Sequence, residues 1–229
     1  MFKPFNTLSA WIDRRHPIPS RFYTAGLIDT PDKDWNVWLS IEEVAPIHEV
    51  EKMNWLSLRD TIRLTENYLK EASELINGLE GGWLDYEERE WILGEIGSPL
   101  IPSLPIYLIS CADESSESLV YVGKTKSTSR FTGGHAAALK LYAPAYDGMK
   151  KRIYRATVWC YTNEEYISLD WIDPENTALE LLDNVESLLI YYLKPEFNTH
   201  KKKTNCAKWD FPIHIQNFLE GGFLNDIFL

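Results

Sequence analysis

Two short apolar segments separated by a polar loop constrain the fold of this chain more than any other feature. The segments are Pro-Ile-Tyr-Leu-Ile at residues 105–109 and Leu-Val-Tyr-Val-Gly at residues 119–123. Apolar, β-branched runs of this length on either side of a polar loop are typical of a β-hairpin. Because alternate side chains of a strand share a face, pairing Ile109 with Leu119 would place Tyr107 across from Tyr121.

Helical patterns precede and follow this hairpin. Apolar residues recur at helical spacing after Ser57, which is a suitable N-cap, and the run from Asp85 to Glu88 has the form of a capping box. The predicted elements after the hairpin are a short helix from His135 to about Tyr142, a strand at 153–161 and a helix at 178–193 capped by Thr177. Residues 1–40 show no sustained periodicity, so irregular structure or short strands are expected there.

Composition and charge divide the chain into three segments. With 45% hydrophobic residues and nine tryptophans among 229, the chain is too apolar to be disordered. Closely spaced prolines before residue 106 mark a boundary, which gives an acidic extension at 1–104, a core at 105–203 and a tail at 204–229 that packs on the core. The net charge of −11 argues against general binding of polyanions, but most of the acidity lies in the extension.

The cysteines and the hydropathy pattern predict a cytoplasmic protein. Cys111, Cys160 and Cys206 are far apart and show no metal-ligand spacing, so disulfides and structural zinc are not expected. No apolar run approaches membrane-spanning length, and residues 1–11 lack the layout of a signal peptide.

A single acidic residue interrupts the apolar stripe of the last predicted helix. Leucines at 179, 182, 189 and 193 define this stripe, and Glu186 falls within it at the same spacing. An unpaired buried carboxylate is costly, so Glu186 needs a nearby cation, a hydrogen-bonded network or solvent at the edge of the stripe. A salt-bridged or partly solvated structural residue and a functional carboxylate both satisfy this requirement.

Four other polar side chains are open to a structural or a functional interpretation. Tyr107 and Tyr121 form either an aromatic core pair or two phenols beside a water molecule that is to be deprotonated. Arg130 lies in a Ser/Thr/Gly-rich turn, from which a guanidinium can point over the sheet toward a phosphate. His135 lies in the first turn of the short helix. Either residue, judged alone, is equally compatible with a surface position.

Together, these residues resemble the motifs of the GIY-YIG nuclease family. Pro105-Ile106-Tyr107 and Tyr121-Val122-Gly123 are similar to its paired motifs, with proline replacing the first glycine and valine the second isoleucine. The later motifs are resembled, in order, by Lys124, Arg130, His135, Glu186-Ser187-Leu188-Leu189-Ile190 and Lys194-Pro195-Glu196-Phe197-Asn198. The resemblance covers about 95 residues. The spacing from Arg130 to His135 is one residue longer than is usual, and the acidic extension matches no known module of the family.

The resemblance implies hydrolysis of a phosphodiester with one divalent metal ion. Glu186 would be the protein ligand to Mg²⁺, with Mn²⁺ as the alternative, and water and phosphate oxygens would complete the shell. Tyr107 would be the general base or a proton relay; because a phenol has a pKa of about 10, the metal and Lys124 would have to assist it. Arg130 would neutralise charge that grows in the transition state.

The remaining motif residues have positioning, structural or substrate-binding roles in this interpretation. Tyr121 and His135 would position the water or the phosphate. Gly123 and Asn198 would be structural, with Asn198 tying the helix end to the sheet. The side chains expected to hold the nucleic-acid backbone are Lys124, Lys150, Lys151, Arg152, Arg155, Lys201, Lys202 and Lys203.

The sequence therefore predicts an α/β chain of the α+β type, with a small antiparallel three-stranded sheet flanked by helices and preceded by a mostly helical extension. The expected function is Mg²⁺-dependent endonuclease activity, with double-stranded DNA as substrate and no membrane association. Compact GIY-YIG restriction endonucleases are closest in size, which suggests restriction or defence. A homodimer is expected if both strands of a symmetric site are cut.

Two alternatives remain at this stage. The chain can be a non-catalytic module of the same fold that binds DNA, or a protein partner through the acidic extension. It can also be a nuclease that is autoinhibited because its acidic extension covers a basic groove as a mimic of duplex DNA.

Overall fold

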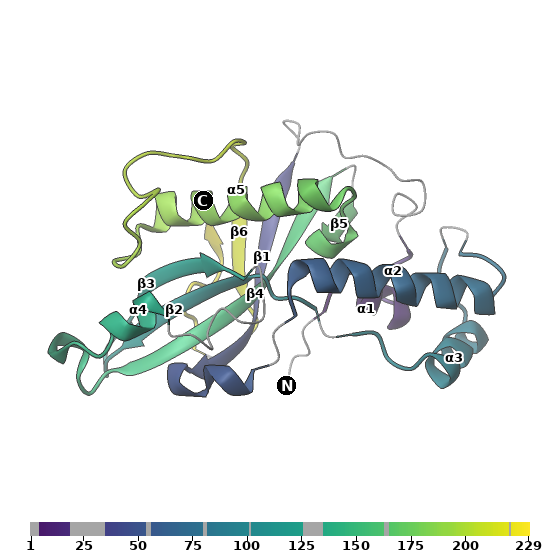
Figure 1. Ribbon diagram of the computed structural model, residues 1–229, viewed down its shortest axis with the longest axis horizontal. Helices are drawn as coiled ribbons and strands as arrows, with labels where there is room; N and C mark the ends of the chain where they lie inside the picture. Colours follow the sequence, from purple (N-terminus) through teal and green to yellow (C-terminus); the bar gives the residue numbers. More distant parts are fainter. Residues whose placement is uncertain are drawn as a thin grey trace.

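The structure, a computed structural model, describes residues 5–18, 35–53, 56–79, 82–100, 102–125, 135–162, 165–219 and 221–229. Within these ranges, seven strands form one mixed sheet in the order β3-β2-β4-β1-β6-β7, with β5 paired to β4 (Figure 1). The strands are β1 (Asn36–Pro46), β2 (Ile106–Ala112), β3 (Glu117–Lys124), β4 (Lys150–Thr162), β5 (Glu165–Ser168), β6 (Ile213–Asn217) and β7 (Ile227–Phe228). Only β1 and β6 pair in parallel; the other described pairs are antiparallel.

The expectation of a small three-stranded antiparallel sheet is wrong, although the chain is α+β overall. The predicted strands correspond to β2, β3 and β4, but β1 from the acidic segment lies beside β4 and pairs with it from Asn36 to Pro46. β6, from the C-terminal tail, adds to the other side of β1. These pairings join segments far apart in the sequence, and local periodicity carries no information about such pairings. The apolar side chains of β1 are buried, with Leu39 and Ile41 at 0% exposure.

The helices follow the local sequence signals closely. Helix α2 (Leu58–Leu75) is capped by Ser57, whose side chain accepts a hydrogen bond from the Asp60 amide. Helix α3 (Tyr86–Glu95) begins with the predicted capping box of Asp85 and Glu88. The remaining helical elements are α1 (Thr7–Ile12), η2 (Ile47–Lys52), α4 (Ala136–Lys140), η4 (Pro144–Tyr146), η5 (Leu169–Trp171) and α5 (Glu175–Leu193). Helix α5 starts after Pro174 rather than after Thr177. None of the described helices combines the length and apolarity needed to cross a bilayer.

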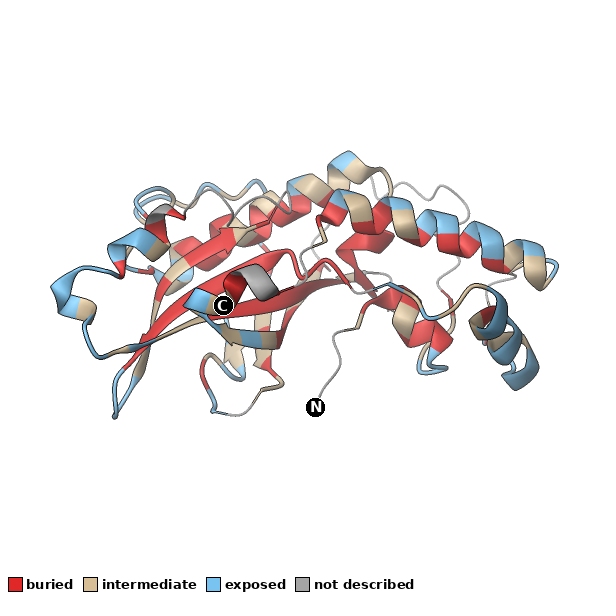
Figure 2. Ribbon diagram, turned by 60° about the horizontal axis from the view of Figure 1, so that its bottom comes forward, coloured by how far each residue is buried: buried red, intermediate tan, exposed pale blue. Residues whose placement is uncertain are grey.

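The two faces of the sheet bury different clusters. Helix α5 lies across one face, where its leucines pack with Leu108 and Val122 in the larger core (Figures 1 and 2). On the opposite face, Tyr107 and Ile109 pack with side chains from α4 and the η2 region in a smaller cluster. Figure 2 shows that α3, at the far end of the molecule, is mostly exposed. The candidate site residues lie at the β3 edge, where both faces are within reach.

The hairpin register differs from the predicted one. Ile109 pairs with Tyr121 and Ser110 with Leu119, because the ladder shifts between Ile109 and Ser110. Tyr107 therefore lies across from Gly123 and diagonal to Tyr121. A diagonal neighbour on the same face is still within reach of an aromatic ring, so the two phenols remain together.

Candidate active site

Three of the predicted site residues converge on one face of the sheet. The rings of Tyr107 and Tyr121 are stacked with centroids 6.0 Å apart, and the His135 ring lies edge-on to both. The Tyr107 hydroxyl and His135 Nε2 form a hydrogen bond of 2.7 Å. His135 reaches this position as the N-cap residue of α4. Tyr107 is fully buried and His135 is 8% exposed, whereas Tyr121 is partly exposed and so more accessible to a ligand.

Gly123 makes this arrangement of rings possible. A Cβ atom at Gly123 would overlap Cζ and Oη of Tyr107 and would lie 2.8 Å from Cε1 of Tyr121. Any larger residue would therefore push the phenols apart. The absence of a side chain at this position in β3 is a packing requirement of the phenol pair, because the Tyr107 hydroxyl occupies the space.

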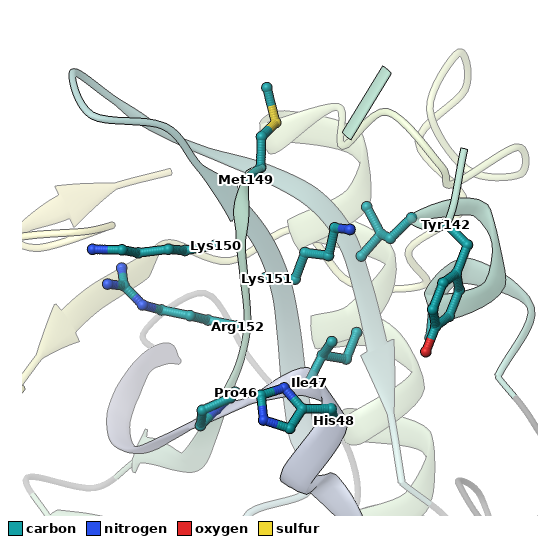
Figure 3. A pocket seen from close by; sticks show the side chains of 10 residues that line it. Pro46, Ile47, His48, Tyr142, Met149, Lys150, Lys151 and Arg152 are labelled. Atoms are coloured by element: carbon teal, nitrogen blue, oxygen red, sulfur yellow. The ribbon is translucent and has the colours of Figure 1, made fainter. Parts of the chain in front are cut away.

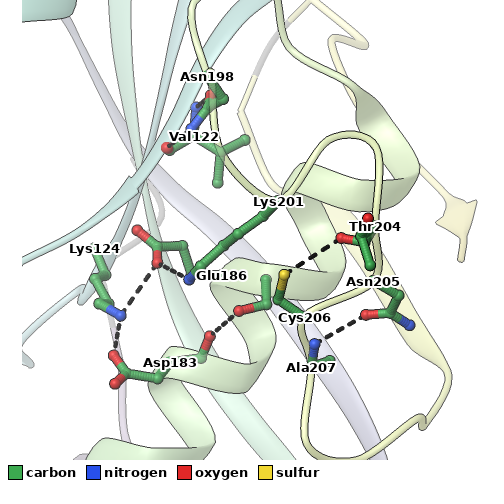
Figure 4. A network of polar contacts seen from close by, with 11 residues as sticks. Val122, Lys124, Asp183, Glu186, Asn198, Lys201, Thr204, Asn205, Cys206 and Ala207 are labelled. Carbon is green, nitrogen blue, oxygen red and sulfur yellow. Dashed lines mark hydrogen bonds and ion pairs between the residues drawn. The ribbon is translucent and has the colours of Figure 1, made fainter.

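Glu186 belongs to a separate, charged cluster on α5 (Figure 4). Its Oε2 atom is 3.1 Å from Nζ of Lys124 and 2.8 Å from Nζ of Lys201, and its side chain is 14% exposed. Lys124 also pairs with Asp183, one helical turn before Glu186. These two lysines are therefore the cations that compensate the charge of Glu186 within the apolar stripe of α5. Asp183 did not emerge from the sequence, although its spacing of three residues from Glu186 places both carboxylates on one helix face.

The charged cluster and the phenols lie on opposite faces of β3. Lys124 pairs with Ile106 and faces α5, while its neighbour Gly123 pairs with Tyr107 and faces the phenols. Successive side chains of a strand alternate between faces, so this separation follows from the register. Among the described strands, β3 lies at the edge of the sheet. Glu186 binds Lys124 and Lys201 rather than either phenol.

Asn198 fastens β3 to the segment that follows α5. Its Oδ1 atom accepts a hydrogen bond from the Val122 amide and its Nδ2 atom donates to the Val122 carbonyl, both at 2.9 Å. Figure 4 shows this side chain against Val122 above the Glu186 cluster. Asn198 is 8% exposed, and its side-chain amide makes the two backbone hydrogen bonds with Val122 that a neighbouring strand would otherwise make.

The basic residues predicted to hold a nucleic-acid backbone do not form one surface. Arg155 is 1% exposed and its Nε atom is 2.7 Å from Oε2 of Glu43, so it is a buried structural ion pair and not a substrate-binding residue. Burial lowers the pKa of the Arg155 guanidinium, and Glu43 opposes this shift. Arg152 pairs with Glu117 at 2.7 Å.

The remaining predicted cations differ in their surroundings. Lys201 is held by Glu186, and Lys202 donates to the Glu196 carbonyl at 3.4 Å. Lys203 and Lys150 are exposed, and Lys151 is partly exposed on β4. Arg130 lies outside the described residues.

The donor set suits a hydrated, hard cation better than a tightly caged one. Asp183 and Glu186 offer carboxylate oxygens from one helix face, but within the described ranges no group of three acidic, histidine or cysteine side chains converges. Mg²⁺ commonly binds through one or two carboxylates and keeps several waters, so two acids are sufficient. In the structure, the Lys124 ammonium group lies between these acids, and it must turn away before a metal ion binds.

Comparisons of the chain with protein-family models, with curated proteins and with solved structures find no match. The functional argument therefore rests on the geometry of the site and on the motif resemblance.

Proposed function

We propose that the protein is a Mg²⁺-dependent endonuclease of the GIY-YIG type that hydrolyses phosphodiester bonds of DNA. The observation that carries this proposal is the cluster of Tyr107, Tyr121 and His135, joined by a 2.7 Å hydrogen bond between Tyr107 and His135. Glu186 supports the proposal from the other side of β3.

The phenol–imidazole pair provides a route for the proton of the attacking water. An imidazolium ion has a pKa of about 6.5 and a phenol has a pKa of about 10, so both side chains can be neutral at pH 7. A neutral His135 Nε2 can then accept the hydrogen of the Tyr107 hydroxyl. Tyr107 Oη can then take a proton from water as it releases its own to His135. Tyr107 is fully buried, so its hydroxyl must become accessible when substrate binds. Tyr121, which is partly exposed, would hold the water or the phosphate.

Asp183 and Glu186 would hold Mg²⁺, which supplies charge neutralisation on the phosphate oxygens. Lys124 would leave its acidic partners and donate to the phosphate instead. Arg130 is proposed to neutralise the charge of the transition state, and Lys203, which is exposed, to contact the backbone. Restriction or defence, and a dimer that cuts both strands, remain part of the proposal through the motif resemblance alone.

The direct test is nicking of supercoiled plasmid with Mg²⁺, with Mn²⁺ and with EDTA. Tyr107→Phe removes only the hydroxyl and keeps the ring stack, so the fold should persist while the nicking rate falls by about a hundredfold. Tyr146→Phe is the matched control: its hydroxyl donates to Glu196 at 2.8 Å, away from His135. It should nick at the wild-type rate.

Three outcomes would overturn the proposal. Metal-independent nicking would contradict the role of Mg²⁺, and nicking that Tyr107→Phe leaves unchanged would show that the phenol cluster is structural. A wild-type protein that binds plasmid but never nicks it would support the non-catalytic module.

A further inference from the structure

A groove of about 680 Å³ opens beside the candidate active site (Figure 3). Its floor is apolar and is formed by Ile47, Leu141 and Met149. Its rim carries the Tyr142 ring, which is 76% exposed, and the His48 imidazole, whose side chain is 74% exposed. Lys151 Nζ lies 5.9 Å from the centroid of the Tyr142 ring. A large exposed phenol therefore lies beside an ammonium group and an apolar floor.

Successive side chains of β4 point to opposite faces of the sheet, and this determines which of its basic residues faces the groove. Lys151 pairs with Cys111 and faces the side of the sheet that carries the smaller core cluster. Figure 3 shows Lys151 pointing toward Tyr142, whereas Lys150 and Arg152 point the other way. The run of three basic residues therefore places one ammonium group in the groove. At the rim, His48 Nε2 lies 3.7 Å from Oε1 of Glu49.

The groove and the phenols border the same smaller core cluster. Leu141 and Tyr107 belong to this cluster, and Ile47, Met149 and Tyr121 pack against it. Helix α4 has His135 as its N-cap, and Leu141, which follows its last residue, lines the groove.

We propose that the groove binds one unpaired nucleotide of a nucleic-acid strand. The base would stack on Tyr142 over the apolar floor, and Lys151 and His48 would contact the adjoining phosphate. Stacking on an exposed aromatic side chain beside a cation is the means by which proteins hold unpaired bases without reading their sequence. The position of this nucleotide beside a scissile phosphate rests on the proposed function; the binding itself does not.

The test measures binding without cleavage, by fluorescence anisotropy in EDTA. The probes are a labelled oligothymidylate of about 12 nucleotides and the fully paired duplex of the same length. Substitution of Tyr142 should affect binding of the single strand more than binding of the duplex, whose bases are paired. Tyr142→Ala should weaken single-strand binding about tenfold. Lys151→Ala should weaken it about threefold and lower the slope of log affinity against log salt by about 0.7.

Matched controls come from α2 and α3, which lie at the opposite end of the molecule from α4 in Figure 1. Tyr86→Ala removes a phenol that is 65% exposed on α3, and Lys70→Ala removes an exposed ammonium group on α2. Both should bind the single strand as the wild type does.

The proposal is overturned if Tyr142→Ala binds the single strand normally, if this substitution weakens duplex binding as much as single-strand binding, or if polyglutamate competes as strongly as the oligonucleotide does. The last result would identify an acidic peptide as the occupant. Loss of binding in Tyr142→Ala, from a wild type that nicks no plasmid, would support the groove and contradict the proposed nuclease.

Discussion

Two acidic residues of this protein lie in nearly closed surroundings and are compensated in opposite ways. Glu186 on α5 has two ammonium partners, Lys124 and Lys201, at 3.1 and 2.8 Å. Glu42 lies at the bulge of β1, is 2% exposed, and accepts hydrogen bonds from the Ser40 hydroxyl at 2.7 Å and the Phe5 amide at 3.0 Å. Burial raises the pKa of Glu42 to about 8, and the hydrogen bonds and Arg15 only partly oppose this shift.

The comparison separates an acid that can exchange its partner from one that cannot. The Lys124 and Lys201 side chains are 15% and 27% exposed, so a phosphate could compete for these lysines and another cation for the Glu186 carboxylate. Glu42 is held by neutral hydrogen-bond donors within the fold. Under the proposed function, Glu186 is therefore the acid that would exchange its partner.

The largest expected effect is on cleavage. Glu186→Gln keeps the shape of the side chain but removes the charge that would hold Mg²⁺, so the nicking rate should fall by about a hundredfold or more. Glu180→Gln on the same helix is the control, since Glu180 pairs with Lys208 at 2.8 Å and is 56% exposed. Equal activity of Glu186→Gln and Glu180→Gln would show that the Glu186 carboxylate has no part in cleavage.

The second effect is a pH dependence of stability that belongs to Glu42. Its pKa is about 8 in the folded state against 4.5 for an ordinary glutamate, so the folded protein keeps a proton that the unfolded chain releases. The free energy of unfolding therefore falls as the pH rises from about 4.5 to about 8, by at most about 1.4 kcal/mol per pH unit. Urea denaturation should show Glu42→Gln gaining stability relative to the wild type over this range. The free energy of unfolding of Glu180→Gln should change with pH as it does in the wild type. If the free energy of unfolding of Glu42→Gln also changed with pH as in the wild type, Glu42 would not hold a proton in the folded state.

Packing of the phenols gives the third prediction. Gly123→Ala inserts a methyl group into the space of Tyr107 and should destabilise the protein by about 1–3 kcal/mol. Gly94→Ala in α3 is the counterpart, because a Cβ there has nothing within 4 Å, and it should stabilise the protein by about 0.5–1 kcal/mol. Thermal denaturation followed by circular dichroism distinguishes the two. A neutral Gly123→Ala would mean that the rings are loosely held.

The smallest effect is expected at Asn198. Asn198→Ala removes both bonds to the Val122 backbone and should cost about 1–2 kcal/mol, because these groups of β3 lose their partner. Asn205→Ala removes one bond within a turn, to the Ala207 amide at 3.0 Å, and should cost less. Chemical denaturation compares them directly. If the two substitutions lowered the free energy of unfolding equally, the two bonds of Asn198 to β3 would contribute no more to stability than the one bond of Asn205 within its turn.

The sequence predicted the local elements and part of the candidate site. Helix caps at Ser57 and Asp85 act over three residues, so they can be identified without tertiary information. The phenols lie on one face for a similar reason, since alternation survives the register shift at Ile109. The sheet was predicted too small because β1, with two consecutive glutamates, lacks a simple alternating pattern.

By itself, the sequence determined helices α2, α3 and α5 and strands β2, β3 and β4, and that Glu186 on an apolar helix face needed a cation, a hydrogen-bonded network or solvent. Only the tertiary structure decided which cations these are, that Arg155 is buried against Glu43, and that Lys151 faces a groove while its neighbours face away. The physical reason is range: capping and periodicity act within a few residues, whereas ion pairs and strand register depend on segments brought together from across the chain.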